Sequence, residues 1–94
     1  MPRRFIDKIR NSIRIGDYDM TYHAVEEMAE DGLDIFDIEN AILNGEIIRI
    51  DKNDPRGTKY VLKGMGDNQP SIIGIVGRFK ETGTFLILTV YKIS

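Results

Sequence analysis

The chain has 94 residues, a formal net charge of −2 at pH 7 and no cysteine. This length suits one domain and is too short for two, so we expect a single domain over residues 1–94. The absence of cysteine excludes disulfides, thiolate zinc sites and a cysteine nucleophile, and it favours the reducing cytoplasm as the compartment. No apolar run reaches the ~18 residues that a membrane-spanning helix needs, so we expect no membrane segment.

Charge is divided along the sequence. Residues 15–48 contain no Lys or Arg but many Asp and Glu, whereas residues 1–14 and 49–94 are mainly basic. One interpretation is that the acidic middle attracts the basic first segment, within one molecule or between two copies as a homodimer. Another is that the basic C-terminal half forms a phosphate-binding face, because clustered cations attract polyanions. The sequence leaves both interpretations open.

Two or three helices are predicted in the first half. Residues 3–15 carry apolar side chains at three- and four-residue spacing, and Gly16 suits the end of that helix. Thr21 suits the N-cap of a second helix over residues 22–31. Asp34 can cap a third helix that ends at Gly45. The carboxylates of these helices lie mostly in first turns, where the helix dipole favours negative charge, and they need no catalytic explanation.

After Gly45 the apolar period becomes that of a strand. The predicted strands cover residues 46–50, 58–63, 71–80 and 84–93. Turn-forming residues lie at 53–57 and 81–83, and residues 64–70 form a loop. Helices followed by consecutive, hairpin-linked strands are typical of an α+β domain, so we predict N-terminal helices packed on a four-stranded antiparallel sheet.

His23 is the only histidine in the chain. Histidine titrates nearest to neutral pH, so His23 is the natural proton carrier if the protein is an enzyme. It lies near a predicted helix start, where the helix dipole stabilises a bound anion. The alternative interpretation is a helix-capping or core-edge residue.

Cationic side chains lie on the predicted sheet. They are Lys59, Lys63, Arg78 and Lys80. Such cations can neutralise the extra charge of a phosphate transition state, or they can simply solvate a sheet face and protect its edge. Thr89 and Tyr91 share one face of the last strand, where Tyr91 either stacks on a base or packs within the protein.

Several motifs of known chemistry are absent. The sequence has no HExxH helix, phosphate-binding loop, dinucleotide-binding turn or calcium loop, and no serine in a nucleophile elbow. With one histidine and no cysteine, a transition-metal site would need carboxylates, and none has a persuasive spacing. We therefore expect neither a metal nor a cofactor.

The order of several motifs resembles a bacterial family. They are Thr21-Tyr22-His23-Ala24-Val25-Glu26-Glu27-Met28, Gly32-Leu33, Asp37-Ile38, Ala41-Ile42-Leu43-Asn44-Gly45-Glu46-Ile47-Ile48 and Ile87-Leu88-Thr89-Val90-Tyr91. Over roughly residues 18–92 the chain resembles the domain of unknown function 4258, which looks like a distant branch of the RelE/ParE, barnase and colicin-type RNase fold. The resemblance implies RNA cleavage in a toxin–antitoxin setting, with RNA and a cognate antitoxin-like protein as partners. Family members typically have arginine where this sequence has Glu27 and Asp31, and these anions would repel RNA phosphate.

Together these observations predict a RelE/barnase-like α+β domain that is a metal-independent endoribonuclease, or a relic that binds RNA without cleaving it. The expected catalytic residues are His23, Arg78 and Tyr91, and the expected substrate-binding residues are Thr89, Lys59 and Lys63. The alternative is a non-enzymatic module that binds another protein through its segregated acidic and basic surfaces.

Overall fold

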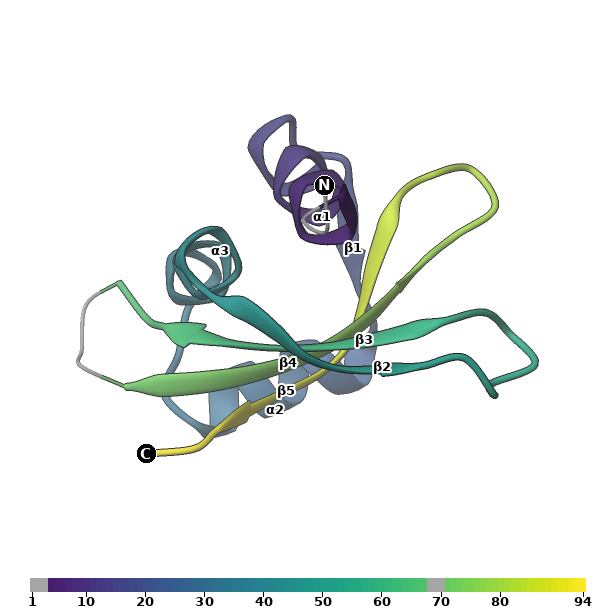
Figure 1. The fold of residues 1–94 in the computed structure, drawn as a ribbon. Coiled ribbons are helices and arrows are strands. Elements are labelled where there is room, and N and C mark those ends of the chain that lie inside the picture. The colour runs from purple at the N-terminus through teal and green to yellow at the C-terminus, as the bar shows by residue number, and fades with distance from the viewer. Residues whose placement is uncertain (1–3, 68–70) are drawn as a thin grey trace.

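The computed structural model describes residues 4–67 and 71–94, which form three helices and one five-stranded sheet (Figure 1). The helices are α1 (Arg4–Arg14), α2 (Tyr22–Glu30) and α3 (Ile35–Asn44). The strands are β1 (Tyr18–Met20), β2 (Glu46–Asp51), β3 (Lys59–Met65), β4 (Ile72–Phe79) and β5 (Phe85–Lys92). The predicted helix start at residue 3 and the last part of the predicted loop, residues 68–70, lie outside the described residues.

The sheet has the strand order β1-β5-β4-β3-β2. β1 runs parallel to β5, and every other neighbouring pair is antiparallel. The α+β class is therefore confirmed, but the predicted four-stranded, wholly antiparallel sheet is wrong. The missed strand is β1, which has only three residues and pairs with residues 85–87 near the other end of the sequence. Three residues are too few to show a strand period, so this pairing leaves no local signal.

Local capping chemistry fixes the helix ends. The Thr21 hydroxyl accepts a hydrogen bond from the backbone N–H of Ala24 at 3.0 Å, which caps α2 as predicted. At the start of α3, Asp34 and Asp37 form a reciprocal capping box, in which each side chain accepts from the other's backbone N–H. Gly16 adopts a φ of +76°, a left-handed conformation that a side chain would disfavour, just after α1 ends.

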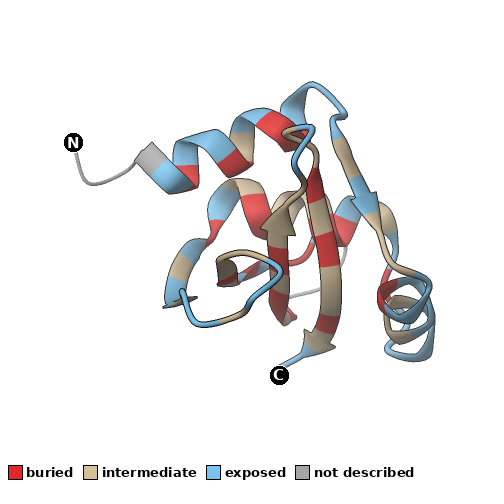
Figure 2. Cartoon of the chain, turned by 90° about the vertical axis from the view of Figure 1, so that its right-hand side faces the viewer, coloured by how far each residue is buried: buried red, intermediate tan, exposed pale blue. Residues whose placement is uncertain are grey.

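The core lies between the sheet and the pair α1 and α3, which sit together on one face of the sheet in Figure 1. The inward side chains of the three central strands form most of it. They are Tyr60, Leu62, Ile73, Ile75, Phe85, Ile87 and Val90. Figure 2 shows buried and partly buried positions interspersed along the strands, and in β3 the two alternate, as a sheet with one covered face requires.

The sheet backbone and α3 meet at Gly64 of β3. A Cβ built on Gly64 would fall on the carbonyl oxygen of Ala41, so only glycine allows this approach. The close contact places α3 firmly over one face of β3. The opposite face of the sheet, turned away from α1 and α3, is called the outer face below.

Candidate functional site

The outer face carries most of the side chains that the sequence analysis singled out. In β3, Tyr60 and Leu62 point into the core, so Lys59 and Lys63 alternate to the outer face. The sheet register then places Val61 beside Val76, and Val76 beside Thr89. The strands thus bring the predicted cations of β3 onto the same face as Thr89.

A hollow of about 270 Å³ opens on this face. Its lining comes from β3, β4, β5 and the turn before β3, and consists of Asp54, Arg56, Lys59, Val76, Arg78, Leu88 and Thr89. Three of these side chains are cations and one is a hydroxyl. The predicted residues Lys59, Arg78 and Thr89 therefore meet in one place, together with Arg56, which the sequence analysis treated only as part of a turn.

Asp54 holds one side of the hollow together. Its carboxylate accepts a hydrogen bond from the backbone N–H of Arg56 at 2.8 Å and lies 3.1 Å from Nζ of Lys59. The Arg56 backbone N–H first, and then the Lys59 ammonium, lower the pKa of Asp54 to about 2. Asp54 therefore stays ionised at neutral pH and offsets part of the positive charge of Arg56 and Lys59.

Arg78 is different, because no residue in the described part of the chain forms an ion pair or side-chain hydrogen bond with its guanidinium. The guanidinium keeps five N–H donors in a planar fork that matches a phosphate or carboxylate. Among the three cations that line the hollow, Arg78 is thus the one that Asp54 does not engage, and its N–H donors can bind an anion. Lys80, by contrast, pairs with Asp19 at 2.7 Å and does not line the hollow.

Tyr91 and Lys63 lie on the outer face but do not line the hollow. Gly74 pairs with Lys63 on one side and with Tyr91 on the other. A Cβ at Gly74 would collide with the ring of Tyr91, so the ring lies across the bare backbone of β4. Tyr91, the residue after Val90 in β5, is therefore partly exposed, and it lies on the same face as the hollow.

His23 lies in the first turn of α2, at the edge of β5. Its side chain is 67 % exposed, and its Nε2 lies 3.2 Å from Oε1 of Glu27, one helical turn further on. His23 is thus a largely exposed residue of the first helical turn, and the N-cap of α2 is Thr21. The contact with the Glu27 carboxylate orients the imidazole, whose side chain stays largely exposed. His23 is not among the residues that line the hollow.

Glu27 and Asp31 have a structural role. β1 ends at Met20, which pairs with Ile87 of β5. Beyond Ile87, β5 has no strand beside it on the side where β1 lies. The backbone N–H of Val90 donates to Glu27 at 3.1 Å, and that of Lys92 donates to Asp31 at 3.1 Å. Side chains of α2 therefore supply the acceptors that a neighbouring strand would supply, which gives a physical reason for carboxylates at these two positions.

Thr21 completes this edge, because its hydroxyl donates to the carbonyl of Leu88 at 3.1 Å while it caps α2. Glu27 links His23 to this edge: its carboxylate contacts the imidazole and accepts from the backbone N–H of Val90, the residue after Thr89. Thr89, which lines the hollow, precedes in sequence the residue that Glu27 contacts.

No group of three or more His, Asp or Glu side chains suited to a metal ion occurs in residues 4–67 and 71–94. In the same residues, no helix has both the length and the apolar character to cross a membrane.

Comparison with known proteins gives one match. No curated protein and no solved structure matches the chain. The model of one family, described as a domain of unknown function (DUF4258), matches residues 20–92, which contain α2, α3 and strands β2 to β5. The chain therefore belongs to the DUF4258 family.

Proposed function

We propose that this domain binds RNA across its outer face and cleaves it without a metal, as a RelE/barnase-like endoribonuclease would. The observation that carries the proposal is the hollow in which Arg78, Lys59, Arg56 and Thr89 meet. Guanidinium and ammonium groups beside a hydroxyl are a suitable donor set for a phosphate oxygen. The proposed partners are RNA and, in a toxin–antitoxin setting in the cytoplasm, a cognate antitoxin-like protein.

The binding step depends on Arg78. Asp54 already engages Lys59 and Arg56, so these two cations bring less net charge to a ligand than Arg78 does. A phosphate in the hollow would accept from the Arg78 guanidinium and the Thr89 hydroxyl. From there the strand would cross Thr89 towards His23 at the edge of β5, and Tyr91 would offer its ring to a base.

The cleavage step depends on the pair of His23 and Glu27. His23 takes the proton of the ribose 2′-hydroxyl while that oxygen forms a bond to phosphorus. The bond from phosphorus to the 5′-oxygen breaks, and the imidazolium returns a proton to the leaving oxygen. The products are a 2′,3′-cyclic phosphate and a 5′-hydroxyl, and Arg78 stabilises the charge on the phosphorane-like transition state.

Glu27 fits this scheme despite its negative charge. Its carboxylate is held by the Val90 N–H and faces the imidazole, so it orients His23 as a carboxylate orients the histidine of other acid–base pairs. Asp31 is similarly occupied by the N–H of Lys92. Their contacts with β5 direct both carboxylates towards protein donors, which reduces the repulsion of RNA phosphate expected from the sequence.

A digestion assay with end-labelled single-stranded RNA tests the proposal. Wild-type protein should generate cyclic-phosphate ends, and His23→Ala should slow cleavage by about 100-fold or more while RNA is still bound. Arg78→Gln should weaken RNA binding. Lys80→Gln is the matched control: it also removes one cation near the end of the sheet, but Lys80 pairs with Asp19, so RNA binding should be unchanged. Equal cleavage by wild type and His23→Ala removes His23 from the chemistry. Binding without cleavage by the wild type reduces the proposal to a relic that only binds RNA.

A further inference from the structure

β2 is an edge strand with exposed apolar side chains. It is the last strand in the sheet order, so its outer backbone edge has no strand beside it. Ile48 and Ile50 are 49 % and 40 % exposed, and Phe5 of α1 is 42 % exposed. A short bulge between Ile47 and Arg49 shifts the register with β3, and the strand is regular after it. Unpaired backbone beside exposed isoleucine is a surface that favours pairing with another strand.

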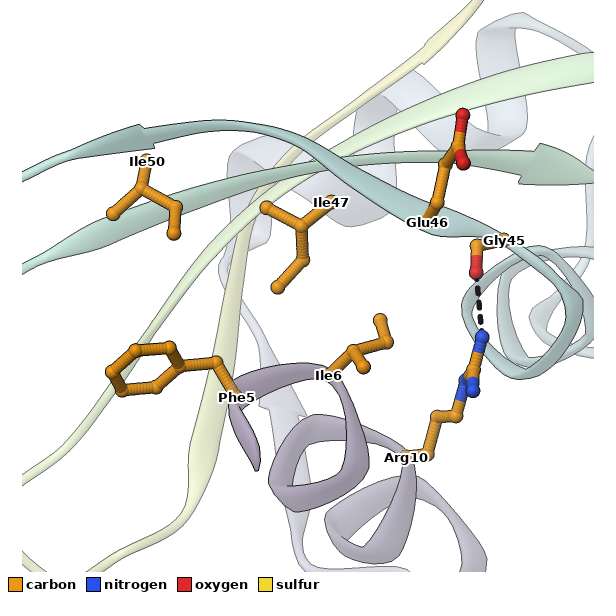
Figure 3. A pocket seen from close by; sticks show the side chains of 7 residues that line it. All are labelled: Phe5, Ile6, Arg10, Gly45, Glu46, Ile47 and Ile50. Atoms are coloured by element: carbon orange, nitrogen blue, oxygen red, sulfur yellow. Dashed lines mark hydrogen bonds between the residues drawn. The ribbon is translucent and has the colours of Figure 1, made fainter. Parts of the chain in front are cut away.

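An apolar hollow of about 300 Å³ adjoins this edge, between α1 and β2 (Figure 3). Its lining consists of Phe5, Ile6, Arg10, Gly45, Glu46, Ile47 and Ile50. Figure 3 shows Phe5 and Ile50 facing one another at one end, and the Arg10 guanidinium beside the Gly45 carbonyl at the other. The guanidinium donates a hydrogen bond of 2.7 Å to that carbonyl. The apolar end of the hollow is therefore continuous with the free edge of β2.

We propose that β2 pairs with β2 of a second copy of this chain, antiparallel about a two-fold axis, so that the two sheets become one. A closed two-fold dimer uses the same surface on both copies, and an edge strand with self-complementary side chains provides such a surface. This interface lies at the β2 edge of the sheet, opposite the edge that begins with β1 and β5, and it does not depend on the proposed RNA chemistry.

The side chains of β2 select the register of this pairing. In an antiparallel pair, residues directly opposite one another lie on the same face, so one residue of β2 must face its own copy at the axis. The regular part of the strand offers Arg49, Ile50 and Asp51 for that place. Arg49 or Asp51 at the axis would put like charges opposite one another, which is destabilising. Ile50 at the axis puts Arg49 opposite Asp51 of the second copy, twice by symmetry.

The same register satisfies the exposed groups of the edge. In residues 4–67 and 71–94 the Arg49 guanidinium has no ion-pair or hydrogen-bond partner, so Asp51 of the second copy would provide one. On the other face, Ile50 would contact its own copy and extend the apolar hollow towards Phe5 of the second copy. The pairing thus combines opposite charges on one face with apolar burial on the other.

Charge reversal tests the register by analytical ultracentrifugation over a concentration series. The wild type should show a monomer–dimer equilibrium. Arg49→Asp places two carboxylates opposite one another and should raise the dissociation constant about tenfold or more. Arg49→Asp combined with Asp51→Arg restores opposite charges and should recover dimerisation. A wild type that stays monomeric at every concentration, or a dimer that is indifferent to Arg49→Asp, overturns the proposal.

A cysteine cross-link tests the axis directly, because the chain has no cysteine of its own. In the proposed register the two copies of Ile50 have Cα atoms about 4.5–5.5 Å apart, a separation that a disulfide spans. Ile50→Cys should therefore form a covalent dimer under mild oxidation. Ile48→Cys is the matched control: it is also exposed, but its two copies lie roughly 13 Å apart and should not cross-link. Cross-linking at residue 48 in place of residue 50 overturns the register.

Discussion

The contact between Glu27 of α2 and the backbone N–H of Val90 makes a testable contribution to stability. Glu27→Ala leaves that N–H without its acceptor, and an unsatisfied backbone donor costs about 1–3 kcal/mol. The Glu27 side chain is 24 % exposed, so water can reach the site, and we expect a loss at the lower end, about 1–2 kcal/mol. In a domain of this size each kcal/mol shifts Tm by roughly 4–8 °C, so the shift should be easily measured.

Urea unfolding followed by circular dichroism measures this loss. Glu26→Ala is the matched control, because Glu26 is an exposed neighbour on the same helix, and both changes remove one carboxylate in favour of alanine. The control should lie within about 0.5 kcal/mol of the wild type. Glu27→Gln keeps an oxygen acceptor and should lose about half as much as Glu27→Ala. If Glu27→Ala and Glu26→Ala have the same free energy of unfolding, the assigned role of Glu27 at the β5 edge is wrong.

Two further predictions concern Tyr18 and Gly64. Burial, and then the hydrogen bond that the phenol donates to Glu39, raise the pKa of Tyr18 well above its ordinary value. The protonated phenol therefore stabilises the fold fully below about pH 10, and this contribution is lost as pH rises further. Between pH 9 and 11 the free energy of unfolding should fall more steeply for the wild type than for Tyr18→Phe. Parallel curves for the two proteins would contradict this role of Tyr18. Gly64→Ala drives a methyl group into the carbonyl of Ala41 and should cost about 3 kcal/mol in thermal unfolding, whereas an unchanged Tm would show that α3 can move away from β3.

Features that arise within a few residues could be predicted from the sequence. Thr21 and Asp34 cap their helices as expected, because an N-cap depends only on the next turn of chain. Four of the strands lie within a few residues of their predicted bounds, since each shows alternation or a run of β-branched residues. β1 could not be predicted, because its three residues are a strand only through pairing with β5.

In the candidate site, too, only the features that depend on neighbouring residues could be predicted. Strand alternation correctly put Thr89 and Tyr91 on one face. The hollow also needs Arg56, whose place depends on how the turn before β3 folds back beside β4 and β5. Nor does the sequence reveal that Glu27 would hold the β5 edge, since that contact joins residues 63 positions apart.

The most direct measurement of the central claim is an NMR titration of ¹⁵N-labelled protein with a short single-stranded RNA at about 50 mM salt, where phosphate contacts are strong. We expect the amide signals of Val76, Arg78 and Thr89 to shift first, the shifts to fade as salt is raised, and Arg78→Gln to reduce them greatly. Shifts confined to the acidic helices, or no shifts at low salt, would contradict an RNA-binding outer face.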